Sequence, residues 1–113
     1  MINNVTLIGR LVADPEVKDL EKSKVANITL AVSRRYKNEQ GEYDTDFVDC
    51  VVWNELASNL KEYCKKGDLV GVIGRVQTTI YTTKEDQKRK TTEIIVEKLS
   101  FLQPKKTEEK TEE

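Results

Sequence analysis

The sequence predicts an all-β domain with one helix, because period-two alternation of apolar residues dominates and only one segment has a helical period. Five segments read as strands, and the helical segment lies between the third and the fourth of them. The chain has 113 residues, the length of one small domain. We therefore expect a single sheet-built domain at residues 1–103, interrupted by one helix.

The first three strands are expected before the helix. VTLIGRL alternates Val5 and Leu7 with Thr6 and Ile8, and the turn sequence at 14–15 ends the segment. VANITLAVSRRY, at 25–36, alternates most clearly, and TDFVDCVVWN, at 45–54, forms the third strand. Between these last two, KNEQGEYD is polar with a central glycine, which is typical of a long exposed hairpin connection.

The helix is expected over NELASNLKEYCKKG, at 54–67. Asn54 has the chemistry of an N-cap, Lys65 and Lys66 suit the last turn, and Gly67 suits the position after the helix. The apolar stripe of this helix consists of Leu56, Leu60, Tyr63 and Cys64. We expect Tyr63, with Phe101 of the last strand, to lie in the core.

The last two strands are expected at DLVGVIGRVQTTIYTT and TTEIIVEKLSFL, joined by the charged loop KEDQKRK. Gly9 inside the first strand indicates a bulge or a sharp bend, one of the devices that let a small sheet curl, and the fourth strand contains Gly71 and Gly74. Five strands with a helix between strands 3 and 4 have the layout of the OB-fold, a five-stranded Greek-key barrel. The same count also suits other small barrels.

Composition argues against catalysis. The chain has no histidine, the commonest general base and metal ligand, and its acidic residues are scattered, so we expect no enzyme activity, no metal and no cofactor. Cys50 and Cys64 occur among apolar residues, which favours packed thiols over a disulfide. No apolar run approaches the length of a membrane span, and we expect a cytoplasmic protein. The net charge of −1 gives no overall basic field.

One strand carries an unusual face. Alternation places Val48, Cys50 and Val52 on one side of 47–54, and Phe47 and Trp53 on the other, together with Asp49 and Val51. The two rings are about 20 Å apart along the strand, a spacing that suits stacking on separate unpaired bases. Tyr36 within RRYK and Tyr81 before KEDQKRK each combine a ring with nearby cations. The alternative is that the rings pack in the barrel or at a subunit interface.

Several segments, taken in order, are similar to the bacterial single-stranded DNA-binding protein family: NNVTLIGRLVADPEV, VANITLAVSRRY, TDFVDCVVW, LASNLKEYCKKGDLVGVIGRVQT and TTEIIVEKLSFL. The resemblance covers about residues 1–103. It implies an OB-fold, a homotetramer, and sequence-independent binding of single-stranded DNA in replication, recombination and repair. It also implies a nucleoid-associated place in the cell.

The resemblance carries site residues onto this chain. The family's stacking aromatics fall on Tyr36, Phe47, Trp53 and Tyr81. The expected phosphate contacts are Arg10, Arg34, Arg35, Lys37, Arg75, Lys84, Lys88 and Arg89. Asp49 and Glu55 stand where many relatives have basic residues, which places part of the usual DNA path in doubt.

The C-terminus departs from the family. Residues 104–113 form a short charged tail, predicted to be disordered, without the acidic tip and hydrophobic end that recruit other replication and repair proteins. We therefore expect no tip-mediated recruitment. Short members of this kind resemble second, tailless copies or phage-encoded versions. The alternative function is an OB-fold protein-interaction module of a primosome-like assembly.

Overall fold

The computed structural model describes residues 1–102, and these form six strands and one helix. The elements are β1 (Val5–Leu11), β2 (Val17–Asp19), β3 (Lys24–Lys37), β4 (Tyr43–Trp53), α1 (Asn54–Tyr63), β5 (Leu69–Thr82) and β6 (Lys88–Phe101). The predicted class, all-β with one helix, is confirmed. The predicted disordered tail at 104–113 lies outside the described residues.

The five long strands close into a barrel. The sheet order is β1-β5-β6-β4-β3-β2, and an additional pairing of β1 with β3 joins its ends. The helix α1 follows β4, the third strand of the barrel, so the predicted OB-fold arrangement is confirmed. The short strand β2 was not predicted. Its three residues are too few to show alternation, and it exists because Val17 and Lys18 pair with the start of β3.

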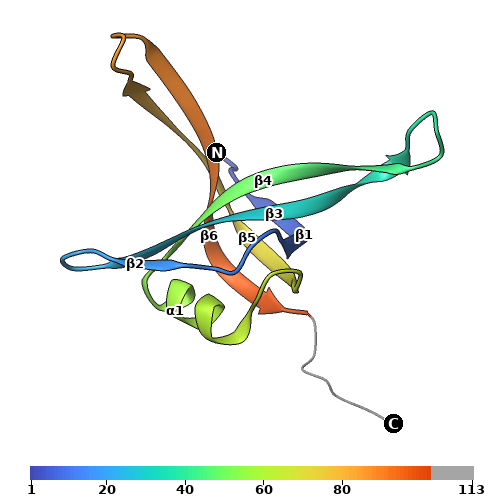
Figure 1. Cartoon of the computed structure of the whole chain (residues 1–113), viewed down its shortest axis with the longest axis horizontal. Helices are drawn as coiled ribbons and strands as arrows, with labels where there is room; N and C mark the ends of the chain where they lie inside the picture. The colour runs from blue at the N-terminus through green and yellow to red at the C-terminus, as the bar shows by residue number, and fades with distance from the viewer. Residues whose placement is uncertain (103–113) are drawn as a thin grey trace.

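Two long hairpins extend from the barrel as separate arms (Figure 1). One consists of β3 and β4, and the other of β5 and β6, whose ladder continues to the pair Thr82 and Lys88. The loop predicted at KEDQKRK is therefore shorter than expected, because its last three residues belong to β6. Where the arms cross, β4 and β6 pair in parallel through Cys50–Ile94 and Val51–Ile95.

The core lies inside the barrel and under α1. Alternation along β3 is confirmed, since Ile28 and Leu30 are buried. Cys50 and Cys64 are buried free thiols, as predicted. The largest fully buried side chains are Leu30, Leu60, Val52, Val70, Val72 and Cys50.

The prediction that Tyr63 and Phe101 lie in the core was wrong. Both side chains are exposed, and their ring centroids lie 5.6 Å apart at the surface, where the end of α1 meets the end of β6. The buried stripe of the helix is narrower than its apolar pattern, with Ala57 and Leu60 facing inward. The barrel end that α1 covers is filled without either aromatic ring.

The predicted N-cap was also wrong. Trp53 holds the N-cap position of α1, and Asn54 has a φ of 59°, in the left-handed region that asparagine tolerates. Its side-chain Oδ1 instead accepts a hydrogen bond from the backbone N–H of Lys24, at 3.1 Å. Lys65 and Lys66 follow the helix rather than forming its last turn, which contains Lys61.

Glycine permits the bend in β5. The register between β5 and β6 shifts between Ile73 and Gly74, as predicted for a glycine within a strand. A Cβ atom at Gly74 would overlap the backbone carbonyl of Ile95. This close approach of two backbones lets the sheet curl into a barrel before β5 continues into its arm.

Candidate nucleic-acid interface

The outward face of β4 presents the two rings predicted from alternation. Val48, Cys50 and Val52 point inward, while Phe47 and Trp53 point outward and are 69% and 40% exposed. Phe47 pairs across the ladder with Ala31, whose methyl group is too small to cover the ring. The ring of Phe47 is therefore open to a flat ligand.

This outward face continues across the crossing into the second arm. Val51 pairs with Ile95, and Ile95 pairs with Arg75, so the three side chains share one side of the sheet. Tyr81 lies six residues after Arg75 along a regular ladder and therefore points to the same side. We call the side shared by Phe47, Trp53 and Tyr81 the outer face; Tyr81 is 49% exposed on it.

Tyr36 lies at the far end of the first arm, and its face is not fixed by alternation. The register of β3 against β4 shifts between the pair Ser33–Thr45 and the pair Lys37–Tyr43. Tyr36 belongs to this irregular stretch and is 81% exposed. It lines an open surface hollow together with Arg34 and Arg35. The ring of Tyr36 is therefore exposed to solvent, but the regular ladder does not assign it to the outer face.

Two of the predicted phosphate contacts lie on the outer face near the rings. Arg10 of β1 pairs with Ala31, the residue that also pairs with Phe47, which places Arg10 and Phe47 two strands apart, about 10 Å. Its Nη1 donates to the carbonyl of Gly67 at 2.9 Å. Arg89 pairs directly with Tyr81 across the second arm. Phe47 and Tyr81 therefore each have a cation on the same side of the sheet.

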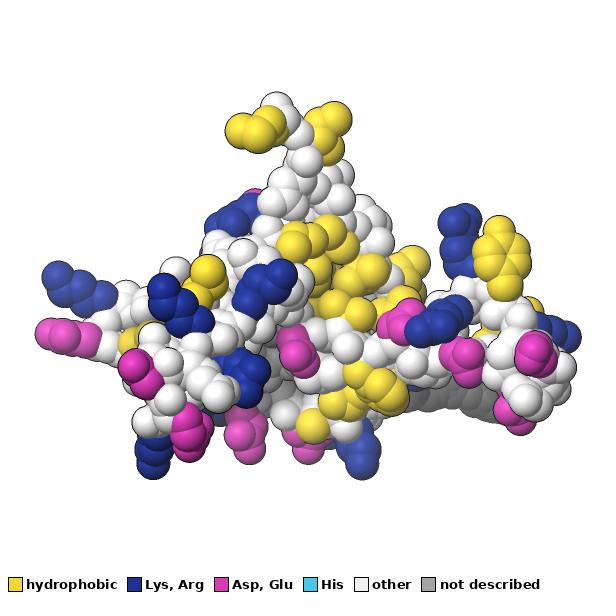
Figure 2. Space-filling model, turned by 90° about the horizontal axis from the view of Figure 1, so that it is seen from above, with side chains coloured by type: hydrophobic (Ala, Val, Ile, Leu, Met, Phe, Trp, Pro, Cys, Tyr) yellow, Lys and Arg dark blue, Asp and Glu magenta, His cyan; other side chains and the backbone are white. Residues whose placement is uncertain are grey.

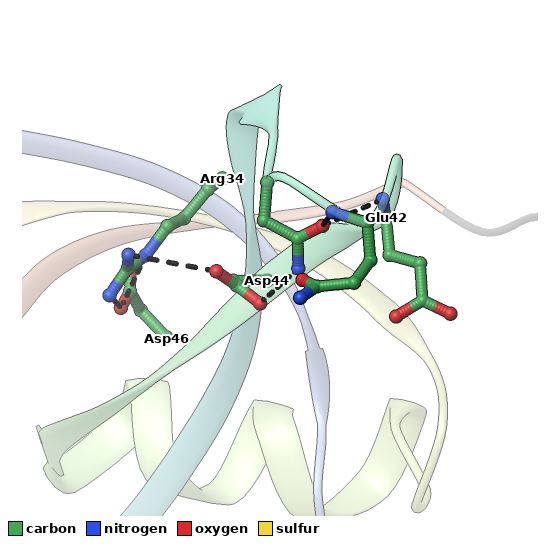
Figure 3. A network of polar contacts seen from close by, with 6 residues as sticks. Arg34, Glu42, Asp44 and Asp46 are labelled. Carbon is green, nitrogen blue, oxygen red and sulfur yellow. Dashed lines mark hydrogen bonds and ion pairs between the residues drawn. The ribbon is translucent and has the colours of Figure 1, made fainter.

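Arg34 is engaged within the first arm (Figure 3). Its Nε and Nη2 donate to Asp46 Oδ1 at 3.1 and 2.9 Å, and Nη1 lies 4.0 Å from Asp44. The hydrogen bond and charge of Arg34 lower the pKa of Asp46, and those of Asp46 raise the pKa of Arg34. Asp46 pairs with Val32, on the side opposite Phe47. Arg34 is therefore not on the outer face with the rings.

The same network fixes the turn of the first arm. Asn38 Oδ1 accepts from the backbone N–H groups of Gln40 and Glu42 at 2.9 and 3.0 Å, and Asn38 Nδ2 donates to Asp44 at 3.0 Å. A side-chain oxygen that binds backbone amides in this way stabilises a tight turn. The arm that carries Tyr36 therefore ends in an ordered turn.

The remaining predicted cations differ in their partners. Arg75 Nε lies 3.6 Å from Glu97, and its Nη1 donates to Gln77 at 2.9 Å. Lys37 Nζ lies 5.9 Å from the ring centroid of Tyr43. Arg35, Lys84 and Lys88 are exposed on the two arms.

Tyr43 is a further candidate site residue that the sequence did not single out. It precedes Phe47 by four residues on the same strand, so alternation alone places it on the outer face. It is 55% exposed, and Lys37 lies beside its ring. The alternation along the strand that identified Phe47 would also have identified Tyr43, because the two residues are an even number of positions apart.

The middle of the outer face is acidic. Asp49 lies between Phe47 and Trp53, and Thr29 Oγ1 donates to its Oδ1 at 3.0 Å. Glu93, two residues before Ile95 on β6, points to the same side. On the outer face, Arg10, Lys37 and Arg89 therefore lie toward the ends and edges. Asp49 and Glu93 lie near the centre, together with Arg75, which is paired with Glu97. In the view of Figure 2, hydrophobic side chains gather near the middle of the molecule, with Lys and Arg side chains to both sides.

Other types of site have little support in the described residues. Within residues 1–102 no three His, Cys, Asp or Glu side chains are grouped so as to hold a metal ion. In the same range no helix is long and apolar enough to cross a membrane. The outer face, with its exposed rings and cations, is the strongest candidate site.

Residues 2–102 match the Single-strand binding protein family. The chain belongs to this family. The match covers all six strands and the helix, and so includes every residue of the outer face. The family is described by the binding of single strands.

Individual relatives agree with this assignment. The chain is 46% identical over 106 residues to a single-stranded DNA-binding protein of Halalkalibacterium halodurans, covering 93% of this chain and 63% of the relative. It is 42% identical over 109 residues to single-stranded DNA-binding protein 1 of Lactococcus lactis, covering 96% and 73%. The chain thus spans less than two thirds of the first relative and about three quarters of the second.

Proposed function

We propose that this protein binds single-stranded DNA without strict sequence preference, by stacking bases on Phe47, Trp53, Tyr81 and Tyr36. The observation that supports the proposal most directly is the shared outer face, on which three exposed rings from two arms point to one side of the sheet. Stacking contributes about 1 to 3 kcal/mol per base and accepts any base, because every base has a π face. Relatives named as single-stranded DNA-binding proteins support the same ligand.

Cations at the ends of the outer face neutralise phosphates in this proposal. Arg10 and Arg89 are the best placed, because each shares a side of the sheet with a ring. Arg35, Lys37, Lys84 and Lys88 serve the arms, where they are exposed. Arg34 and Arg75 contribute less, because each already has a carboxylate partner.

The wider role follows from the same proposal. A protein that coats single strands protects them during replication, recombination and repair, and it works in the cytoplasm in association with the nucleoid. We propose a homotetramer as the working form. Exposed apolar side chains on β1 and β5, such as Ile8 and Ile73, support association with further subunits.

The test uses Trp53, the single tryptophan of the chain. The protein is titrated with oligo-dT at two salt concentrations while Trp53 fluorescence is followed, and the titration is repeated with duplex DNA of the same length. We expect quenching by the single strand that weakens with salt, because phosphate neutralisation releases counterions. Duplex DNA is expected to quench little, because its bases are already stacked.

A companion variant, Phe47→Ala, tests the stacking face without touching the reporter. Loss of one stacked base, about 1 to 3 kcal/mol, corresponds to roughly 5- to 150-fold weaker binding. Leu20→Ala is the matched control, because Leu20 is exposed in the turn between β2 and β3. Absence of quenching from folded wild-type protein would contradict the proposal and direct attention to the protein-interaction alternative.

A further inference from the structure

Asp49 occupies a distinctive position on the outer face. It lies two residues after Phe47 on the same side of β4, about 7 Å along the strand. The Thr29 hydroxyl donates to its Oδ1 at 3.0 Å, which orients the carboxylate. Within residues 1–102, that hydroxyl is the only hydrogen-bond partner of this carboxylate, and no Lys or Arg forms an ion pair with it. Oδ2 is therefore available to a ligand.

The surroundings of Asp49 favour a base over a phosphate. Glu93 of β6 points to the same side, and its partner across the second arm is the neutral Gln77. Arg75 pairs with Ile95, two residues along from the Gln77–Glu93 pair, and its Nε lies 3.6 Å from Glu97. Two carboxylates repel a phosphate from the centre of the face, so the sugar-phosphate chain is directed to the cations at the ends and edges. The edges of stacked bases are then the polar groups that reach Asp49.

A carboxylate distinguishes the bases by their donors. It accepts hydrogen bonds and donates none, and the exocyclic amino group of cytosine is its characteristic partner among base edges. Adenine and guanine also carry amino groups. Thymine carries none, and its two carbonyl oxygens flank its single ring N–H, so that their lone pairs face the carboxylate.

We infer that Asp49 makes the stacking face selective, favouring cytosine and other amino-bearing bases over thymine at the position next to Phe47. This inference rests on the proposed function, since it concerns the same surface. It deepens that function by assigning base discrimination to one side chain, on a surface whose rings alone accept every base.

The test measures a ratio rather than a single affinity. Oligo-dC and oligo-dT of equal length are titrated into wild-type protein, Asp49→Asn and Asp49→Ala, with Trp53 fluorescence as the readout. Asparagine keeps the shape of the side chain but offers both a donor and an acceptor, and alanine offers neither. Glu62→Gln is the control, because it removes one exposed negative charge on α1, away from the outer face.

We expect the ratio of dC affinity to dT affinity to fall by roughly three- to tenfold in both Asp49 variants, the size of one hydrogen bond of ordinary net strength, because the site is exposed to solvent. Glu62→Gln should leave the ratio unchanged. Comparing this ratio between the wild type and each variant cancels any intrinsic difference in how the two homopolymers stack.

Two contrary outcomes are distinguishable. If both Asp49 variants bind dC and dT more tightly by the same factor, Asp49 acts only by repelling phosphates and the inference is overturned. If wild-type protein is folded but neither oligomer quenches Trp53, the proposed function itself fails. The variants are expected to fold, because Asp49 is exposed and has one side-chain partner.

Discussion

Tyr81 on β5 and Arg89 on β6 lie directly opposite each other in the second arm, so that a ring and a guanidinium share one side of the sheet. In the proposed function, Tyr81 stacks on a base and Arg89 neutralises a neighbouring phosphate. The two groups have different signatures in binding, because stacking is insensitive to salt and phosphate neutralisation is not.

Separate replacement of the two residues should reveal these signatures. Tyr81→Leu is expected to weaken binding of single-stranded DNA with no change in salt dependence. Arg89→Gln is expected to lower the slope of log K against log salt by about 0.7, the value for one phosphate on a single strand. Ile80→Ala is the matched control, because Ile80 is 68% exposed and points to the other side of β5. Equal slopes in all three variants would remove Arg89 from the phosphate path.

The Arg34–Asp46 pair predicts a pH dependence of stability. Arg34 holds the pKa of Asp46 below its usual value of 3.8. A carboxyl group with a lowered pKa in the folded state stabilises that state above the unfolded pKa, and this stabilisation is lost as pH falls through the folded pKa. We expect Asp46→Asn to be less stable than wild type at pH 7, with the difference disappearing as pH falls below 3.8.

Urea unfolding at a series of pH values, followed by circular dichroism, measures this difference. Arg34→Gln should show the same pattern with a small further loss, because it also removes the charge that lies 4.0 Å from Asp44. The double variant should be no less stable than Arg34→Gln alone, because the Asp46 interaction is already absent there. Both groups are exposed, so the effect is small and screened by salt. A difference that persists unchanged at pH 2.5 would show that the ion pair is not its cause.

The bend at Gly74 predicts a sharp loss of stability on substitution. Gly74→Ala places a Cβ against the backbone carbonyl of Ile95. A backbone atom cannot move aside as the end of a flexible side chain can, and overpacking of this kind costs about 1 to 3 kcal/mol. Gly71→Ala on the same strand is the control, since its Cβ would meet Leu102 and Ser100 at 3.4 and 3.5 Å, ordinary contact distances. Thermal unfolding should separate the two variants, and equal melting temperatures would contradict the close approach at Gly74.

The two thiols are expected to be unreactive in the native protein. Burial, with a smaller contribution from the charge of Asp49, raises the pKa of Cys50 to about 12, and burial with Asp68 raises that of Cys64 to about 11. Because the thiolate is the nucleophile, a thiol reagent at pH 8 should label neither residue until urea unfolds the chain. Rapid labelling of one thiol in native protein would identify local opening at that site.

The sequence predicted the long strands and the helix because each has a regular apolar period. It did not predict β2, whose three residues form a strand only because they pair with the start of β3. Asn54 was misassigned as a cap because its true partner, Lys24, lies 30 residues away. Tyr63 and Phe101 were misassigned because a helical stripe or strand face says nothing about where the barrel ends.

The site was predictable to a similar degree. Alternation alone indicated the exposed side of β4 with Phe47 and Trp53, and the resemblance to a family added the roles of the cations. The partners of these cations, such as Asp46 for Arg34, depend on cross-strand register, which no local pattern contains. The face of Tyr36 depends on an irregular register that sequence alone does not show.

The two arms pair directly through Cys50 with Ile94 and Val51 with Ile95, and β1 links them a second time by pairing with both β3 and β5. Each arm is held along its length by an antiparallel ladder with one register shift. In mechanical terms, the closed barrel clamps the root of each arm, and beyond it each hairpin is a beam only two strands wide (Figure 1). Bending is therefore expected along the free lengths of the arms rather than at the angle between their roots.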